Sequence, residues 1–351
     1  MPIKPLAKSV LFSAARHLGG NALWRRMSRN RPLMLCYHGV VSDDYRGDAY
    51  RSRGVIFRRV FREQLETLAR FCNPISARDL LAWKQGEAEL PPRPVLITFD
   101  DGYRNVLTNA LPELTRLGIP ALINVTTGHI GEARVLWPQE LDERILGWKS
   151  KMLPLPENGS EIVLPADTVA RAGVAARVRA VCKRIPNGLR GSYLERLRGD
   201  PLPCDQEWFH ELYDFSTWEE VRKQHRQGFE IGSHTVSHPI LTRLAPDEVD
   251  TELRRSKATI ERELGAECPW IAYPNGGPAD VSEEIARRAK EAGYKIGLTL
   301  IERPNTPATD PLLFHRLCVL GNLPVNVFHA KISGLYWHAK RFLDDSTDVC
   351  A

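Results

Sequence analysis

The feature that most constrains the fold of this chain is a short apolar run that ends in two adjacent carboxylates and a glycine. The run is 94–99, and Asp100, Asp101 and Gly102 follow it directly. An apolar and β-branched run without polar alternation is typical of a strand buried on both faces, as in a parallel sheet, and Gly102 indicates the turn that ends it. Two acids at a buried strand end are costly unless a cation, a metal ion or strong donors balance them. The sequence therefore predicts a positive partner for these carboxylates.

A second strand-like run, 229–233, leads into His234 and His238, which are four residues apart. Two imidazoles at this spacing can face one point, and with one carboxylate they make an open three-ligand site for zinc or a similar divalent ion. Each motif is weak evidence alone, because Asp-Asp-Gly is typical of turns and histidine fills many roles without a metal. The combination of the two motifs predicts a divalent metal site.

Together the two motifs resemble those of the polysaccharide deacetylase family, also called carbohydrate esterase family four or the NodB-homology domain. The resemblance rests on Thr-Phe-Asp-Asp-Gly at 98–102 and His-Thr-Val-Ser-His at 234–238, and it covers roughly residues 32–319. It implies that Asp100 is the catalytic base. It implies a metal-ligand set of Asp101, His234 and His238.

A third family motif, in which an arginine precedes a Pro-Tyr-Gly turn, has a divergent counterpart at 272–276. Here Ala272 stands in place of the arginine and Asn275 in place of the tyrosine. By position, the backbone N–H of Asn275 would stabilise the oxyanion of the reaction. The family arginine orients the base, and Arg316, at the start of the last predicted strand, is the candidate to replace it. The expected substrate contacts are Tyr103, Tyr273, Pro274, Asn275 and Arg316.

The resemblance also requires a general acid, usually a histidine near the C-terminal end of the domain. In a subgroup similar to bacterial exopolysaccharide and poly-N-acetylglucosamine deacetylases, the strand order is permuted and an N-terminal Tyr-His supplies this acid. Tyr37-His38 matches that pattern, so we expect His38 to be the general acid. His315, in the run Phe-His-Arg-Leu, is the alternative.

Strand-like runs alternate with amphipathic helices along most of the chain. About seven parallel strands, each followed by a helix, predict a distorted (β/α) barrel with all C-terminal strand ends on one face, where barrel enzymes carry their active sites. The expected barrel domain spans 31–335, with a mostly helical insertion at about 131–215 that contains no convincing apolar strand, and a C-terminal tail at 336–351. Six polar candidates follow predicted strand ends: His38, Asp100, Asp101, His234, His238 and Asn275.

Composition limits the classes of partner. The chain has 351 residues, of which 43% are hydrophobic and 26% charged, as is typical of a globular protein. A net charge of +5 gives no argument for nucleic acid as a partner. Residues 1–30 form a basic arm, and we do not expect a signal peptide there because the apolar run 10–15 is short and Arg16 interrupts it. The arm is expected either to contact the inner-membrane surface or to pack as a helix on the main domain.

Seven cysteines are scattered along the chain without a Cys-x-x-Cys pair. This pattern argues against a disulfide scaffold and against a thiolate zinc site. It predicts buried thiols, for example at Cys36, Cys268 and Cys318, and a cytoplasmic, reducing location with peripheral membrane contact as an option.

The resemblance implies metal-dependent hydrolysis of N-acetyl groups on an amino-sugar polysaccharide or on its lipid-linked precursor. The expected cofactor is a divalent metal ion such as zinc, and the expected partner is a glycan. Two alternatives stay open. One is deformylation of a lipid-linked formamido sugar, and the other is a noncatalytic glycan-binding barrel.

Overall fold

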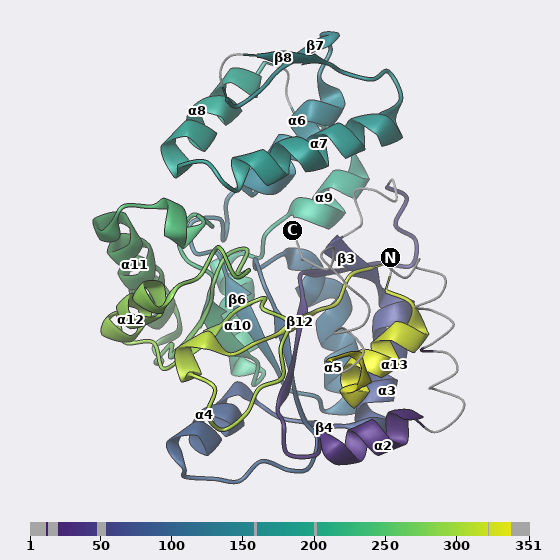
Figure 1. Cartoon of the computed structure of the whole chain (residues 1–351), viewed down its shortest axis with the longest axis vertical. Coiled ribbons are helices and arrows are strands. Elements are labelled where there is room, and N and C mark those ends of the chain that lie inside the picture. Colours follow the sequence, from purple (N-terminus) through teal and green to yellow (C-terminus); the bar gives the residue numbers. More distant parts are fainter. Residues whose placement is uncertain are drawn as a thin grey trace.

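The computed structural model describes residue 12 and residues 20–47, 54–157, 160–199, 202–321 and 323–337. Its body is a curled parallel sheet with the strand order β11-β10-β9-β6-β5-β1-β12, and β4 pairs with β5 (Figure 1). The strands are β1 Leu33–Tyr37, β4 Asn73–Pro74, β5 Pro94–Phe99, β6 Ala121–Val125, β9 Glu230–Ser233, β10 Trp270–Ala272, β11 Ile296–Leu298 and β12 Leu317–Cys318.

The sheet curls so far that its two ends approach each other. Leu298 of β11 forms a parallel bridge with Phe314, which lies shortly before β12, while β12 pairs with β1. The prediction of a distorted (β/α) barrel with about seven parallel strands is confirmed. Every residue of β5 is buried, as its largely apolar sequence without polar alternation predicts. Gly102 has φ +94° at the turn after β5, where an added Cβ would lie 3.0 Å from Ile130, so the turn requires glycine.

Amphipathic helices cover the outside of this sheet. In α3, Phe61 packs edge-on against Tyr37 of β1, with ring centroids 5.2 Å apart, and it also contacts Phe99 of β5. Each such fully buried side chain contributes about 1.5–3 kcal/mol. The helices around the body are α3 Arg58–Phe71, α4 Ala77–Gln85, α5 Leu111–Leu117, α10 Trp218–Arg226, α11 Pro246–Leu264, α12 Glu283–Glu291 and α13 Val325–Ser333.

Short elements complete the connections between these helices and strands. A parallel pair, β2 and β3, follows β1, and a π-helical turn, η2, precedes α5. The 3₁₀ turn η3 follows β9, and the 3₁₀ turn η4 precedes β12. Their bounds are β2 Gly39–Val41, β3 Val55–Phe57, η2 Val106–Ala110, η3 Leu241–Arg243 and η4 Pro311–Leu313.

The segment 131–215 forms a cap beyond the C-terminal ends of the strands (Figure 1). It has its own apolar core, in which Leu141, Ile145, Leu153 and Tyr193 are fully buried. It also holds a short antiparallel hairpin, which the apolar pattern does not predict because each strand has only three residues and exposes side chains. The cap elements are α6 Trp137–Gly147, β7 Met152–Pro154, β8 Glu161–Val163, α7 Thr168–Cys182, α8 Asn187–Leu197 and α9 Glu207–Tyr213.

The described part of the basic arm packs on the body. Helix α2, Gly20–Met27, is followed by Ser28, which lies against Gly334 at the end of α13. Phe12 is buried with Ala330 and Tyr336. This packing supports the expectation that the basic arm packs as a helix on the main domain. The other arm residues, and 338–351 of the expected tail, lie outside the described residues.

Among the described residues, no helix has the length and apolar character needed to span a bilayer. Cys36, Cys72, Cys182 and Cys268 are buried free thiols. Cys318, in contrast, is disulfide-bonded, so the prediction of a buried thiol there is wrong.

Candidate active site

Non-glycine residues with positive φ gather in the loops that follow the strands. The backbone at such positions costs about 1–3 kcal/mol each and persists where the surrounding structure holds it. In the loop after β9, the carboxylate of Glu252 accepts hydrogen bonds from the N–H groups of Val236 and Ser237, at 2.7 and 3.0 Å. The strained positions in these loops are Asp101 (77°), Thr235 (66°), His238 (58°) and Asn275 (58°).

Three potential metal ligands face one another at this end of the sheet. Oδ1 of Asp101 lies 3.5 Å from Nε2 of His234 and 3.5 Å from Nε2 of His238. All three side chains are buried. Nδ1 of His234 lies 2.8 Å from the carbonyl oxygen of Ala272, so Nδ1 carries the proton and donates it. The Nε2 atom of His234 therefore presents its lone pair to Asp101.

This arrangement fits a divalent metal ion. An imidazole lone pair and a carboxylate oxygen repel each other unless a cation lies between them, and Asp101 Oδ1 has no hydrogen-bond partner among the described residues. Burial lowers the pKa of both His234 and His238, which favours the neutral form that binds metals. Burial and the neighbouring Asp100 raise the pKa of Asp101, and a cation would favour its ionised form. Two imidazoles and one carboxylate are a typical open zinc-site donor set.

The second carboxylate, Asp100, is held by a buried arginine. Arg316 donates to Asp100 through both terminal nitrogens, at 2.8 and 2.6 Å, and the two side chains are almost fully buried. Nδ2 of Asn124 donates to Asp100 at 2.8 Å, and the thiol of Cys36 donates at 3.4 Å. Burial opposes ionisation of Asp100, but the charge and hydrogen bonds of Arg316, with the nearby histidines His234 and His38, together outweigh it and hold the pKa of the carboxyl well below its usual range. Asp100 is therefore ionised and fixed in orientation.

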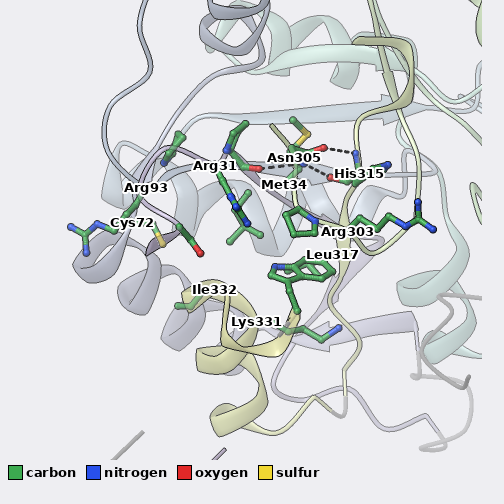
Figure 2. Close-up of a pocket in the computed structure, with 17 residues that line it drawn as sticks. Arg31, Met34, Cys72, Arg93, Arg303, Asn305, His315, Leu317, Lys331 and Ile332 are labelled. Atoms are coloured by element: carbon green, nitrogen blue, oxygen red, sulfur yellow. Dashed lines mark hydrogen bonds between the residues drawn. The ribbon is translucent and has the colours of Figure 1, made fainter. Parts of the chain in front are cut away.

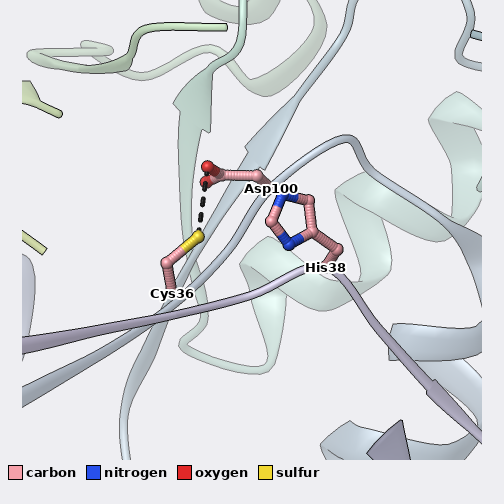
Figure 3. Close-up of side chains that lie close together, drawn as sticks. All are labelled: Cys36, His38 and Asp100. Atoms are coloured by element: carbon pink, nitrogen blue, oxygen red, sulfur yellow. Dashed lines mark hydrogen bonds between the residues drawn. The ribbon is translucent and has the colours of Figure 1, made fainter. Parts of the chain in front are cut away.

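His38 lies beside this carboxylate. Figure 3 shows the side chains of Cys36, His38 and Asp100 close together at the ends of β1 and β5, and one potential ligand atom of each lies within 4.8 Å of the others. Burial lowers the pKa of His38 to about 4, although the negative charge of Asp100 acts in the opposite direction. His38 is therefore a neutral imidazole at pH 7. Because Arg316 occupies Asp100, this cluster is less suited to a metal than the Asp101 site.

A cavity of about 330 Å³ connects these groups. It is lined by His38, Asp100, Asp101, Tyr103, His234, His238 and Asn275. The structure thus brings together all six polar candidates that follow strand ends, and Tyr103 with them. The hydroxyl of Tyr103 and Nδ2 of Asn275 are buried and have no hydrogen-bond partner among the described residues. These atoms are available to a bound ligand.

Four other candidates lie away from the cavity wall. Tyr273 is fully buried, and its hydroxyl donates to the carbonyl oxygen of Leu312 at 2.9 Å. Pro274 and Arg316 are also absent from the cavity lining, and Arg316 acts on Asp100 instead of on a ligand. His315 lines a different cleft at the N-terminal ends of β1, β5 and β12, where it bonds to Asn305 (Figure 2). The structure therefore favours His38 over His315 as a group that can reach Asp100.

The far wall of the cavity comes from the cap, which sequence reasoning did not assign to the site. Helices α6 and α7 contribute polar and charged side chains to this wall. They are Gln139, Asp142 and Glu143 from α6, Arg179 from α7 and Lys183 just after α7. No motif marks these residues, because their spacing is that of ordinary amphipathic helices. Only the placement of the cap over the strand ends reveals them.

The low pKa of His38 predicts a loss of stability in acid. An unfolded histidine binds a proton near pH 6.5, whereas folded His38 stays neutral down to about pH 4. As the pH falls from 7 to 5, the unfolded state therefore gains the proton first, and the metal-free protein loses about 2 kcal/mol of unfolding free energy through this residue. We expect His38→Gln to lose about 2 kcal/mol less unfolding free energy than the wild type between pH 7 and pH 5, as measured by denaturant unfolding at each pH.

The control is His210→Gln. His210 is exposed, and its hydrogen bond to Asp214 raises its pKa, so its charged form stabilises the fold in acid. The His210 variant is expected to show at least the full acid loss of the wild type, because it lacks this stabilisation in acid. An equal acid loss in the His38 variant would contradict the assignment of a buried neutral imidazole.

Comparison with known proteins identifies the family of this chain. A family model described as polysaccharide deacetylase matches residues 87–163 and 186–297. The putative polysaccharide deacetylase YxkH of Bacillus subtilis (strain 168) is 27% identical over 121 residues, which are 34% of this chain and 42% of the relative. The match thus spans less than half of that relative's length.

Solved structures share the fold. A Streptococcus pyogenes deacetylase, PplD, has a TM-score of 0.56 and 17% sequence identity, and the match covers 87% of this chain and 99% of PplD. IcaB from Ammonifex degensii has a TM-score of 0.54 and 18% identity over 87% of this chain and 96% of IcaB. The family model matches more than half of the chain, and its matched segments contain both the carboxylate pair and the histidine pair, so the chain belongs to the polysaccharide deacetylase family.

Proposed function

We propose that this protein is a metal-dependent hydrolase that removes N-acetyl groups from an amino sugar in a glycan. One observation carries the proposal: a buried, ionised carboxylate, Asp100, stands directly beside a three-ligand site whose lone pairs converge on one point. A glycan-binding module has no need of such a base next to a metal site. A hydrolase needs both.

The metal site supplies one part of the chemistry. A divalent ion held by Asp101, His234 and His238 would act as a Lewis acid on the amide carbonyl and would lower the pKa of water toward about 7. The chain supplies the remaining groups. Asn275 lies on the cavity wall in a strained conformation, and in the proposal its backbone N–H donates to the carbonyl oxygen as that oxygen becomes negative.

Proton transfer runs through Asp100 and His38. Asp100 removes a proton from the attacking water, and the oxygen of that water forms the new bond to the acyl carbon. The lowered pKa of Asp100 makes it a weak base, so the proton passes on to His38, whose pKa of about 4 is higher. His38 then protonates the amine nitrogen as the C–N bond breaks. The products are acetate and a free amino sugar.

The test combines metal content with acyl release. We expect purified wild-type protein to bind one equivalent of zinc and to release acetate from N-acetylglucosamine oligomers. Asp100→Asn should keep the metal but lower acetate release by at least the 10²–10⁴-fold that a general base contributes.

Formate release from an N-formyl amino sugar is measured in parallel, because the same groups would hydrolyse that amide. Metal binding without release of either acid from any glycan would leave the proposal without support. Equal release by the wild type and Asp100→Asn would exclude Asp100 as the base.

A further inference from the structure

Part of the cavity wall that faces the catalytic groups lies outside the segments that the family model matches. The family model leaves residues 164–185 unmatched, and this stretch contains α7, Arg179 and Lys183. From α6, Gln139 lines the same cavity, and its Oε1 is buried without a hydrogen-bond partner among the described residues. A ligand held near the metal site would therefore touch the cap, and the cap is positioned to select that ligand.

The carboxylates that line the cavity are already balanced by neighbours. Asp100 is paired with Arg316, and Asp101 belongs to the metal site. In the cap, Asp142 is ion-paired with Arg179, and Glu143 accepts a hydrogen bond from Tyr213 at 3.0 Å. Each of these carboxylates except Asp101, which the proposed metal ion would balance, thus has a cation or a donor within the protein.

Lys183 is different. Its ammonium makes no hydrogen bond or direct ion pair with the described residues, although it lines the cavity. Asp142 and Asp280 act on it from a distance, but Asp142 is committed to Arg179 and Asp280 accepts from the Gly277 N–H. Burial lowers the pKa of Lys183 to about 8, so the group still carries its charge at pH 7.

Lys183 lies close enough to His38 for its charge to influence the pKa of that histidine. Burial is the main cause of the low pKa of His38, and the Lys183 charge acts on it in the same direction. Because Lys183 is half-buried and has no direct partner among the described residues, its charge is available to pair with an anionic group of a bound ligand.

We infer that Lys183 binds an anionic substituent of the substrate, so that the preferred substrate is an N-acylated amino sugar that carries a phosphate or carboxylate group close to the acyl amide. The inference rests on the proposed function for the identity of the reacting group. The binding contribution of Lys183 can be measured without turnover.

The experiment uses zinc-loaded full-length Asp100→Asn protein, in which turnover is suppressed. Calorimetry compares N-acetylglucosamine with its 1-phosphate, its 6-phosphate and N-acetylmuramic acid, which carries a carboxylate. We expect at least one anionic sugar to bind about tenfold or more tightly than the neutral sugar, as one charge-assisted hydrogen bond provides. The set also distinguishes a phosphate from a carboxylate.

In the Asp100→Asn protein, the additional substitution Lys183→Met is expected to bring the affinities for the anionic and neutral sugars within about twofold of each other. Lys183→Arg is expected to retain most of the preference for the anionic sugar. Lys151→Met is the matched control, because Lys151 is an exposed lysine of the same cap outside the cavity lining. Thermal unfolding and zinc content verify that each variant is folded.

The outcomes separate the two proposals. A preference for an anionic sugar that disappears only in Lys183→Met supports the inference, even if wild-type protein releases no acetate from any sugar and the proposed function fails. Equal binding of all sugars, or a preference that survives in Lys183→Met, overturns the inference, even if acetate is released from neutral oligomers.

Discussion

Replacement of His234 by alanine is expected to abolish stoichiometric zinc binding and, with it, hydrolysis. Nε2 of His234 and Oδ1 of Asp101 face each other at 3.5 Å, and within the described part of the chain the site offers three protein ligands. Loss of an outer-shell partner typically costs 10–100-fold in metal affinity, and removal of a direct ligand should cost more. Equilibrium dialysis against a competing chelator gives the affinity of each variant.

Thermal and denaturant unfolding provide a second readout that does not depend on activity. Zinc at about 100 times its dissociation constant is expected to stabilise the wild type by about 2.7 kcal/mol and to leave His234→Ala unchanged. His129→Ala is the matched control. His129 is a buried histidine whose ring lies 5.2 Å from that of Phe215, and it lies outside the ligand set. Zinc stabilisation that persists in His234→Ala but disappears in His129→Ala would relocate the metal site.

The carboxylate and histidine motifs could be predicted because each depends on local sequence. The run before Asp100 is apolar and β-branched without polar alternation, as is typical of a strand buried on both faces, and parallel topology then fixes the face on which its end lies. The same reasoning places His38 and Asn275. Resemblance to a family motif predicts the segment that reaches the site better than it predicts which side chains face the cavity. Tyr273 and Pro274 lie in the predicted segment, but they are absent from the cavity lining.

The cap could not be predicted in the same way. Asp142 and Lys183 lie in or beside helices of mixed spacing, and nothing in their local sequence separates a side chain that faces the cavity from one that faces water. Their place on the cavity wall follows from how two segments of the chain pack together. The short β7–β8 hairpin escaped prediction for a related reason, because strands of three residues carry too little pattern to be distinguished from loops.

Replacement of Arg316 by methionine is expected to destabilise the protein by about 3–5 kcal/mol, because it leaves the buried Asp100 without its cation. Arg316 donates two hydrogen bonds to Asp100 and a third to Thr98 Oγ1 at 2.9 Å. The loss of unfolding free energy should be largest near neutral pH. In the wild type, the Arg316 charge lowers the pKa of Asp100, so its contribution is present above the unfolded pKa near 3.9 and is lost as the pH falls below that value.

A double-mutant cycle separates this pairing from a simple loss of packing. Asp100→Asn removes the negative charge, so the double variant Asp100→Asn with Arg316→Met should recover much of the stability that Arg316→Met loses, while hydrolysis stays low because no base is present. Arg316→Ala adds the cost of a cavity, which the second substitution cannot restore. If the effects of the two substitutions on unfolding free energy are additive, Arg316 acts as a core side chain only. Coupling of a few kcal/mol, measured at pH 7 in metal-free protein, would instead establish that Arg316, directly before β12, holds Asp100, which follows β5 more than two hundred residues earlier in the chain.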